Sequence, residues 1–146
     1  MSFTDMFTQL VRAEIALWNS LERQLHKDAT ISLATFQALS TIGQADGPVR
    51  VQDISEALSI TVGATSKLVD RLERDGLAQR TSNPNDRRSS LIALTAAGTS
   101  SLTGATASAE AHLASILGKE FSRERTASLA DDLSSLHRHV AEGAGS

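Results

Sequence analysis

Residues 61–98 constrain the fold of this chain more than any other stretch. Between Val62 and Asp75, apolar residues recur at helical spacing with basic residues among the exposed positions, which predicts an amphipathic helix. Gly76 then ends the helix, because glycine readily adopts the positive φ found after a helix C-terminus. Two strand-like runs follow, Leu77–Thr81 and Ser90–Thr95, separated by the turn-rich sequence NPNDRRS. The stretch therefore predicts a helix that leads directly into a hairpin with arginines at its tip.

A second helix is predicted immediately before this stretch. The run from Gln52 to Leu58 is amphipathic, and only Ser59 and Ile60 separate it from Thr61, a good cap for the next helix. Two helices joined so tightly are typical of a helix-turn-helix, and the hairpin extends it to a winged helix. In such a fold the second helix can enter a DNA major groove while the hairpin tip reaches the neighbouring minor groove. An ordinary helix pair in a bundle is the alternative, which the hairpin disfavours.

The distribution of charge agrees with DNA binding better than the net charge does. The chain carries a formal net charge of −3. Residues 61–98 hold six basic and four acidic residues, a net of +2, which leaves −5 for the remainder. A locally basic module on an acidic body suits DNA binding, because phosphate contacts need positive charge only at the contact surface.

Several functional classes have no support in the composition. The chain has no cysteine, which excludes disulfides, thiolate metal sites and thiol-based redox sensing. Its four histidines lack close ligand spacing, so we expect no metal site. We find no nucleophile–base–acid arrangement and no phosphate-cradling glycine loop, and we therefore expect neither an enzyme nor a cofactor. Because no apolar run approaches a membrane span and the N-terminus lacks signal-peptide features, we expect a cytoplasmic protein without membrane contact.

Amphipathic helices are predicted at both ends of the chain. Residues 3–27 carry apolar side chains at spacings of three and four, and residues 122–142 show a heptad-like stripe: Leu129, Leu133, Leu136 and Val140. Beyond Thr95, a plausible helix cap, residues 96–118 have a linker-like composition but keep helical spacing, so we predict a third long helix there. Each terminal helix could pack on its own core or on a second chain, and together they favour a dimer. A helix at Leu33–Ala45 and a short strand at Val49–Val51 complete the order.

The order of elements and the motifs resemble the MarR family of winged-helix transcriptional regulators. The resemblance covers about residues 5–140 and is most specific in LVDRLERDGLAQRTSNPNDRRSSLIALTAAG, from Leu68 to Gly98. There, Asp86-Arg87-Arg88 followed by Leu94-Thr95 and Gly98 forms the family's wing signature. It implies a mainly α fold with a small β-hairpin wing (α+β). It also implies a single domain over residues 1–146, with a winged helix-turn-helix lobe at 33–96 and dimerisation helices at 3–30 and 97–142.

The resemblance also implies a function. Family members are homodimers that bind a pseudo-palindromic operator in double-stranded DNA, usually as repressors, and a small, often aromatic or phenolic, ligand releases them. The recognition helix at 61–75 is expected in the major groove and the wing at 77–95 in the minor groove. The alternative is a winged-helix protein-interaction module without DNA binding, which the basic hairpin tip disfavours.

Specific DNA contacts follow from the resemblance. Arg88 matches the wing-tip arginine of the minor groove, and Asp86 matches the acidic partner that orients it, although Asp86 could simply form the turn. Arg87 is expected to reach phosphate or solvent, and Arg71 to clamp a phosphate. Lys67 lacks the bidentate fork of the arginine often found there, so its contact should be looser. A solvated helix face is the alternative for the recognition-helix residues. The candidate DNA-binding residues are Thr61, Val62, Gly63, Ala64, Thr65, Ser66, Lys67, Arg71, Asp86, Arg87 and Arg88.

Two positions depart from the family pattern, and one cation has an alternative role. Arg50 stands where relatives usually carry a Ser or Thr cap, and Ser59 stands where the turn often carries Gly. Both are expected to lower local stability, while Arg50 could add a phosphate contact. Arg74 is as readily explained by an ion pair with Asp70, four residues earlier, as by a DNA contact.

Overall fold

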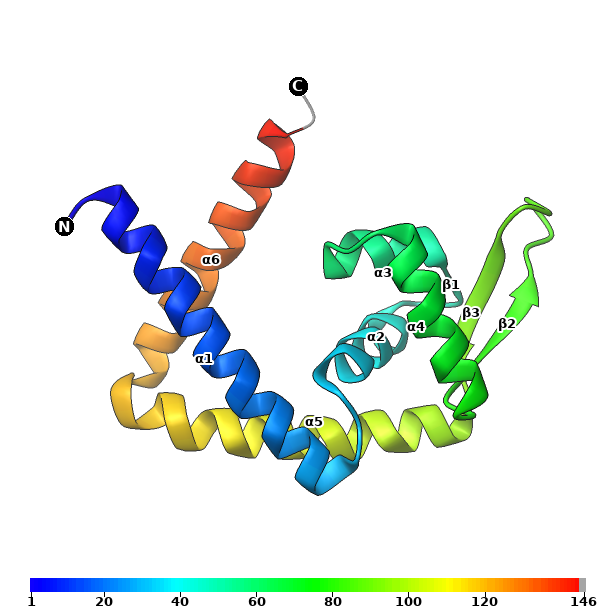
Figure 1. Cartoon of the computed structure of the whole chain (residues 1–146), viewed down its shortest axis with the longest axis horizontal. Helices are drawn as coiled ribbons and strands as arrows, with labels where there is room; N and C mark the ends of the chain where they lie inside the picture. Colours follow the sequence, from blue (N-terminus) through cyan, green and yellow to red (C-terminus); the bar gives the residue numbers. More distant parts are fainter. Residues whose placement is uncertain (145–146) are drawn as a thin grey trace. The chain divides into compact units, whose positions relative to one another are not determined.

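Helices make up most of the chain, and a small antiparallel sheet lies beside α4 (Figure 1). The computed structural model describes residues 1–144, which fall into two compact units divided between Ala109 and Glu110. The elements in chain order are α1 (Phe3–Ala29), α2 (Leu33–Gln44), β1 (Val49–Arg50), α3 (Val51–Leu58), α4 (Val62–Arg74), β2 (Ala78–Ser82), β3 (Ser90–Leu94), α5 (Ala96–Glu120) and α6 (Arg123–Gly143). The predicted mainly α fold with a β-hairpin wing is confirmed.

Most helices begin where the sequence supplies a hydroxyl cap. A Ser or Thr side chain accepts the backbone N–H three residues further on at the start of four helices in the described chain: Ser2, Ser32, Thr61 and Ser122. The Thr95 hydroxyl likewise accepts the Gly98 N–H at 3.0 Å, where α5 begins. These bonds satisfy amides that have no partner within the helix, so the caps predicted at Thr61 and Thr95 are confirmed.

The sheet joins the start of the helix-turn-helix to the wing. Its strand order is β1-β3-β2, with Val49 opposite Ile92 and Arg80 also opposite Ile92. The hairpin strand begins at Ala78, one residue later than predicted, because the Leu77 N–H still donates to the Leu72 carbonyl at 2.8 Å. Gly76 has a φ of 74°, the left-handed conformation expected of the residue that ends α4.

One apolar core holds the winged helix together. Leu68, Val69 and Leu72 on α4 are at most 2% exposed, so this face of the helix is fixed against the rest of the lobe. The other buried members come from α2, α3 and the three strands: Ala38, Leu39, Ile42, Val49, Ile54, Ala78 and Ile92. Because one face of α4 is buried, the opposite face is presented outward in a defined orientation.

Ser59 ends α3 in a conformation that suits glycine better. It lies in the left-handed region with φ 54° and ψ 41°. A Cβ in this region costs about 1 kcal/mol. We therefore expect Ser59→Gly to raise the free energy of unfolding by about 1 kcal/mol in urea denaturation. Ser59→Ala keeps the Cβ and is the control, which should not stabilise the chain. An unchanged urea midpoint for Ser59→Gly would contradict the expected strain.

The second unit holds the end of α5 and α6. No residue of α6 in the described chain is buried, and its heptad-like stripe is 42–61% exposed: Leu129, Leu133, Leu136 and Val140. Such a row of large apolar side chains is unusual on a helix that remains exposed to water. Across residues 1–144, we find no helix with both the length and the apolar character to span a bilayer.

Candidate nucleic-acid interface

The first turns of α4 present small and apolar groups to solvent. Thr61, Val62, Gly63 and Ala64 are exposed, and Val62 has 53% of its surface accessible. Ser66 is half-buried at the edge of this face. The exposed face therefore combines apolar methyl groups with positions that allow close approach, as base contacts in a groove require.

Thr65 does not belong to this face. Its side chain is 0% exposed, and its hydroxyl donates to the Thr61 carbonyl at 2.9 Å. The expectation that Thr65 faces a DNA groove is wrong, because positions 65, 68, 69 and 72 share one helical stripe and that stripe is the core face. The hydroxyl is satisfied within the helix, which allows a threonine to be buried here.

The basic residues of α4 differ in their partners. Lys67 and Arg71 are exposed and lie one turn apart on the helix. The expected pairing of Arg74 with Asp70 does not form: Arg74 Nε lies 3.6 Å from the carboxylate of Asp75, its neighbour in sequence. Asp70 is bound instead by an arginine of the wing, as described below.

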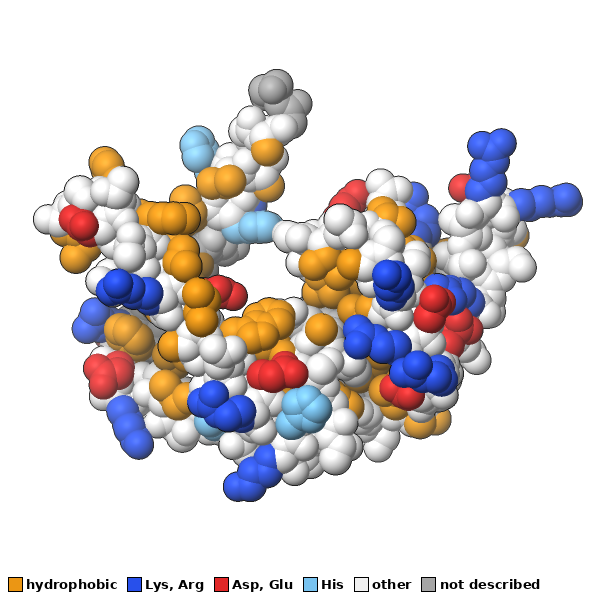
Figure 2. Space-filling model, in the orientation of Figure 1, with side chains coloured by type: hydrophobic (Ala, Val, Ile, Leu, Met, Phe, Trp, Pro, Cys, Tyr) orange, Lys and Arg blue, Asp and Glu red, His pale blue; other side chains and the backbone are white. Residues whose placement is uncertain are grey.

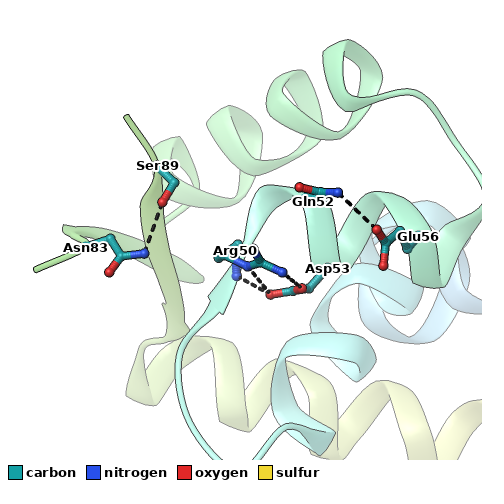
Figure 3. A network of polar contacts seen from close by, with 6 residues as sticks. All are labelled: Arg50, Gln52, Asp53, Glu56, Asn83 and Ser89. Atoms are coloured by element: carbon teal, nitrogen blue, oxygen red, sulfur yellow. Dashed lines mark hydrogen bonds and ion pairs between the residues drawn. The ribbon is translucent and has the colours of Figure 1, made fainter. Parts of the chain in front are cut away.

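The hairpin tip is shaped by side chains that bind the backbone. Asn83 Oδ1 accepts the Asn85 N–H at 3.0 Å, and the Asn83 amide donates to the Ser89 hydroxyl at 3.0 Å across the turn (Figure 3). Asp86 Oδ1 accepts the backbone N–H of Arg88 at 2.9 Å. The turn-forming role of Asp86 is therefore present. Within residues 1–144 its carboxylate makes no ion pair with the Arg88 guanidinium, so the orienting role remains a prediction.

The hairpin tip carries two arginines. Arg87 and Arg88 are both exposed, and Figure 2 shows two basic side chains that extend from the end of the hairpin into solvent. A guanidinium held out on a thin hairpin can enter a narrow and strongly negative groove that a helix cannot enter.

Arg50, at the start of α3, is bound by a carboxylate three residues further on. Asp53 accepts the Arg50 backbone N–H at 2.8 Å, Nη2 at 2.8 Å and Nε at 3.3 Å (Figure 3). These hydrogen bonds, above all the side-chain one, hold the pKa of Asp53 below its ordinary value, and the same pairing raises the pKa of Arg50. The carboxylate thus satisfies the helix start that Arg50 cannot cap itself, and the loss of stability expected there is partly offset. The acidic residue at the third helical position was the sequence signal for this.

A cleft of about 600 Å³ brings the two predicted contact regions together. It lies between the starts of α3 and α4 and the outer part of the wing. Its lining includes Val62 and Ser66 of the recognition helix and Asp86 and Arg88 of the wing; the other lining residues are Arg50, Val51, Gln52, Arg80, Ser89 and Ser90. Helix and wing therefore form one surface, with arginines from three elements around it.

Arg80 was counted from the sequence only as one more basic residue. In the structure its guanidinium lies 2.6 Å from Asp70 and 2.7 Å from Glu73, both on α4. Spacing rules for helix pairs could not find this contact, because it joins a strand to a helix.

Among residues 1–144, no group of three His, Asp or Glu side chains is arranged to hold a metal ion.

The comparisons with known proteins agree with this geometry. Residues 29–89 match the sequence model of the MarR family. The multiple antibiotic resistance protein MarR of Escherichia coli is 35% identical over 68 residues, which are 47% of this chain and 46% of that protein. The winged-helix part of this chain is therefore similar to the MarR family. The match spans less than half the length of this MarR relative.

Solved MarR family structures match over nearly the whole chain. A MarR family transcriptional regulator from Streptomyces coelicolor, solved in complex with DNA, superposes with a TM-score of 0.82 at 24% identity, covering 96% of this chain and 86% of that chain. CouR from Rhodococcus jostii RHA1, solved with p-coumaroyl-CoA, gives 0.80 at 23% identity, covering 90% and 91%. At these identities the likeness establishes the MarR fold.

Proposed function

We propose that this chain is a sequence-specific DNA-binding transcriptional regulator. The observation that supports it best is the shared surface on which the exposed start of α4 and the wing residue Arg88 line one cleft. A recognition helix and a basic hairpin on one face suit adjacent major and minor grooves of a duplex. Such a regulator works with its DNA in the cytoplasm.

Each exposed residue of this surface has a proposed contact. Val62 and Ala64 offer methyl groups to the methyl group of thymine, and Gly63 permits close approach to base edges. Lys67 binds a base or a phosphate, while Arg71 and the amides at the start of α4 bind phosphates. On the wing, Arg88 enters the minor groove and Arg87 binds the flanking phosphates, with Asp86 fixing the turn that carries both.

We propose that the active species is a homodimer, with the helices in residues 3–30 and 97–142 forming the interface and residues 33–96 the DNA-binding lobe. Apolar side chains exposed along α1 support this, among them Phe3, Phe7 and Ile15. The exposed leucine stripe of α6 supports it as well. Two copies would bind half-sites about 34–36 Å apart, which a pseudo-palindromic operator provides.

A charged substitution in the exposed stripe of α6 is expected to break the proposed dimer. Leu133→Asp places a carboxylate in the middle of the α6 stripe, and burying it unpaired costs several kcal/mol. We expect sedimentation to give twice the 15.5 kDa chain mass for the parent protein and a monomer for this variant. Ala127→Asp places the same charge on the opposite side of α6 and should leave the dimer intact. A monomeric parent at micromolar concentration would contradict the proposed interface.

We also propose that the regulator is a repressor released by a small-molecule effector. The structure of CouR with p-coumaroyl-CoA supports a ligand of this kind for a protein of the same fold. A thermal-shift screen of aromatic acids and their thioesters tests this, with loss of DNA binding as the second readout. A compound that raises the thermal midpoint and lowers DNA affinity meets both criteria. Compounds that stabilise the protein without altering DNA binding would contradict the release mechanism.

Selection from a random duplex library tests DNA binding itself. We expect the protein to enrich a pseudo-palindromic sequence. The logarithm of its affinity for that duplex should fall linearly with the logarithm of the salt concentration. A protein-interaction module, the alternative function, would enrich no sequence. Enrichment of nothing from the random library or from genomic fragments would overturn the proposal.

A further inference from the structure

Arg80 binds the recognition helix from the wing at several points. Its Nη1 donates to Asp70 Oδ1 at 2.6 Å and to Glu73 Oε1 at 2.7 Å, and Nη2 reaches the Ser66 carbonyl at 3.5 Å. The Arg80 backbone N–H also points to Glu73 Oε2, at 3.4 Å. The side chain is 26% exposed, much less than that of Arg74 at 70%. This is the most extensively bonded cation described in residues 1–144.

These contacts lie away from the connection between helix and wing. α4 passes into β2 through a short link, Asp75 to Leu77, whose Gly76 and Leu77 carbonyls accept hydrogen bonds from Thr95. Arg80 contacts positions seven, ten and fourteen residues back along the chain, toward the start of α4. The pairing of β3 with β1 holds the base of the wing, and the Arg80 contacts at several points along α4 add a direct restraint on the angle between wing and helix. Since the wing tip lies beyond Arg80, a small rotation at the link would move Arg88 by a larger distance.

Charge gives the contacts a second effect. Asp70 and Glu73 are carboxylates on the same helix as Lys67 and Arg71, and unpaired carboxylates close to DNA repel its phosphates. The Arg80 guanidinium lies within hydrogen-bond distance of both. The hydrogen bond to Asp70, followed by the electrostatic effect of that carboxylate, raises the pKa of Arg80. This agrees with a guanidinium that is bound by carboxylates of the same chain.

We propose that Arg80 is a positioning residue of the DNA-binding surface. It holds the wing at a fixed angle to the recognition helix and binds the two carboxylates of that helix, which reduces their combined charge from −2 to −1. It does not contact DNA itself. This inference rests on the proposed function and concerns a residue outside the predicted contact set.

A double-mutant cycle separates this role from a direct DNA contact. The probe is the duplex that the parent protein enriches from a random library. We expect Arg80→Gln to weaken binding about 10- to 100-fold in the parent background, because it leaves two unpaired carboxylates near the phosphates. In the background Asp70→Asn/Glu73→Gln, the same change should cost less than about threefold, because the partners through which Arg80 acts are already absent. An equal cost in both backgrounds would show a direct contact with DNA and overturn the inference, as would parent-like binding by Arg80→Gln.

A distance measurement without DNA tests the fixed angle independently. The chain has no cysteine, so spin labels can be placed at Ala64→Cys on α4 and Asn85→Cys on the wing tip. We expect one narrow intrasubunit distance distribution in the labelled protein, and a broader one once Arg80→Gln is added. Arg74→Gln is the matched control: it removes an exposed arginine of the same helix with a single 3.6 Å contact, and the distribution should stay narrow.

The two measurements distinguish the two proposals. A parent protein that enriches no duplex overturns the proposed function and, with it, the DNA-binding role of Arg80. If the parent binds DNA but the distribution is equally narrow with and without Arg80, the inference fails while the proposed function stands. Lower affinity that disappears in the double-substituted background, together with a broadened distribution, supports the inference.

Discussion

Arg88→Ala is expected to weaken binding to the selected duplex by about 10- to 100-fold, which corresponds to about 1–3 kcal/mol. The side chain is exposed at the wing tip, and the contact that fixes Arg88 uses its backbone N–H, bound by Asp86 at 2.9 Å. Truncation beyond the Cβ leaves that bond in place, so the thermal midpoint and the dimer mass should not change. Fluorescence anisotropy measures the affinity, and calorimetry measures the midpoint.

Two controls assign the loss to the minor groove. Arg87→Ala removes the same charge from the neighbouring position and should lower affinity less. Because it removes a phosphate contact, the affinity of this variant should also depend less steeply on salt concentration. Diaminopurine in place of adenine beneath the wing adds an amino group to the minor groove, where A·T pairs otherwise present only acceptors. This probe should weaken binding by the parent protein and have little effect on Arg88→Ala. If the alanine variant kept full affinity, the minor-groove assignment would be wrong.

The sequence predicted what depends on local spacing. Helical periodicity located α1, α4 and α6, hydroxyl caps located the starts of α4 and α5, and Gly76 located the end of α4. The hairpin followed from turn-forming residues between two strand-like runs. Each of these signals lies within a few residues of the feature that it predicts, so one sequence is sufficient to detect it.

The sequence could not predict which side chains meet across elements. Thr65 was assigned to the groove because its hydroxyl suits base contacts, but the phase of the helix against the core decides its burial. For Arg74, the four-residue rule offered an ion pair with Asp70 beside a DNA contact, whereas the register of β2 beside α4 brings Arg80 to Asp70. The burial of Thr65 and the partner of Asp70 both depend on how α4 packs against the rest of the lobe, which spacing along the sequence does not determine.

These contacts also change the meaning of the charge count. Of the six basic residues in 61–98, Arg80 and Arg74 have carboxylate partners. The other four are exposed, two on the recognition helix and two at the wing tip: Lys67, Arg71, Arg87 and Arg88. The net charge of +2 therefore understates the positive charge available at the surface, since both Asp70 and Glu73 are bound by Arg80.

Gly98→Ala is expected to be the most destabilising of the glycine-to-alanine changes in residues 1–144. A Cβ at Gly98 would lie 1.9 Å from the Leu77 carbonyl oxygen and 2.9 Å from its carbon. These are backbone atoms, and the same carbonyl accepts the Thr95 N–H at 3.1 Å. The first turn of α5 would have to move away from the link between α4 and the wing. We expect a loss of about 3 kcal/mol in the free energy of unfolding, at the upper end of overpacking effects.

Gly104→Ala is the matched control in the same helix. No atom of the described chain lies within 4 Å of a Cβ built there, and the position is exposed. Alanine should stabilise α5 by about 0.5–1 kcal/mol, because it reduces the backbone freedom of the unfolded chain. Urea denaturation of both variants therefore gives shifts of opposite sign. Equal shifts would mean that helix propensity alone governs both positions. Opposite signs would show that the contact of Gly98 with the Leu77 backbone governs the start of α5. A change at the start of α5 would then reach the DNA-binding surface through Leu77, which links the recognition helix to the wing.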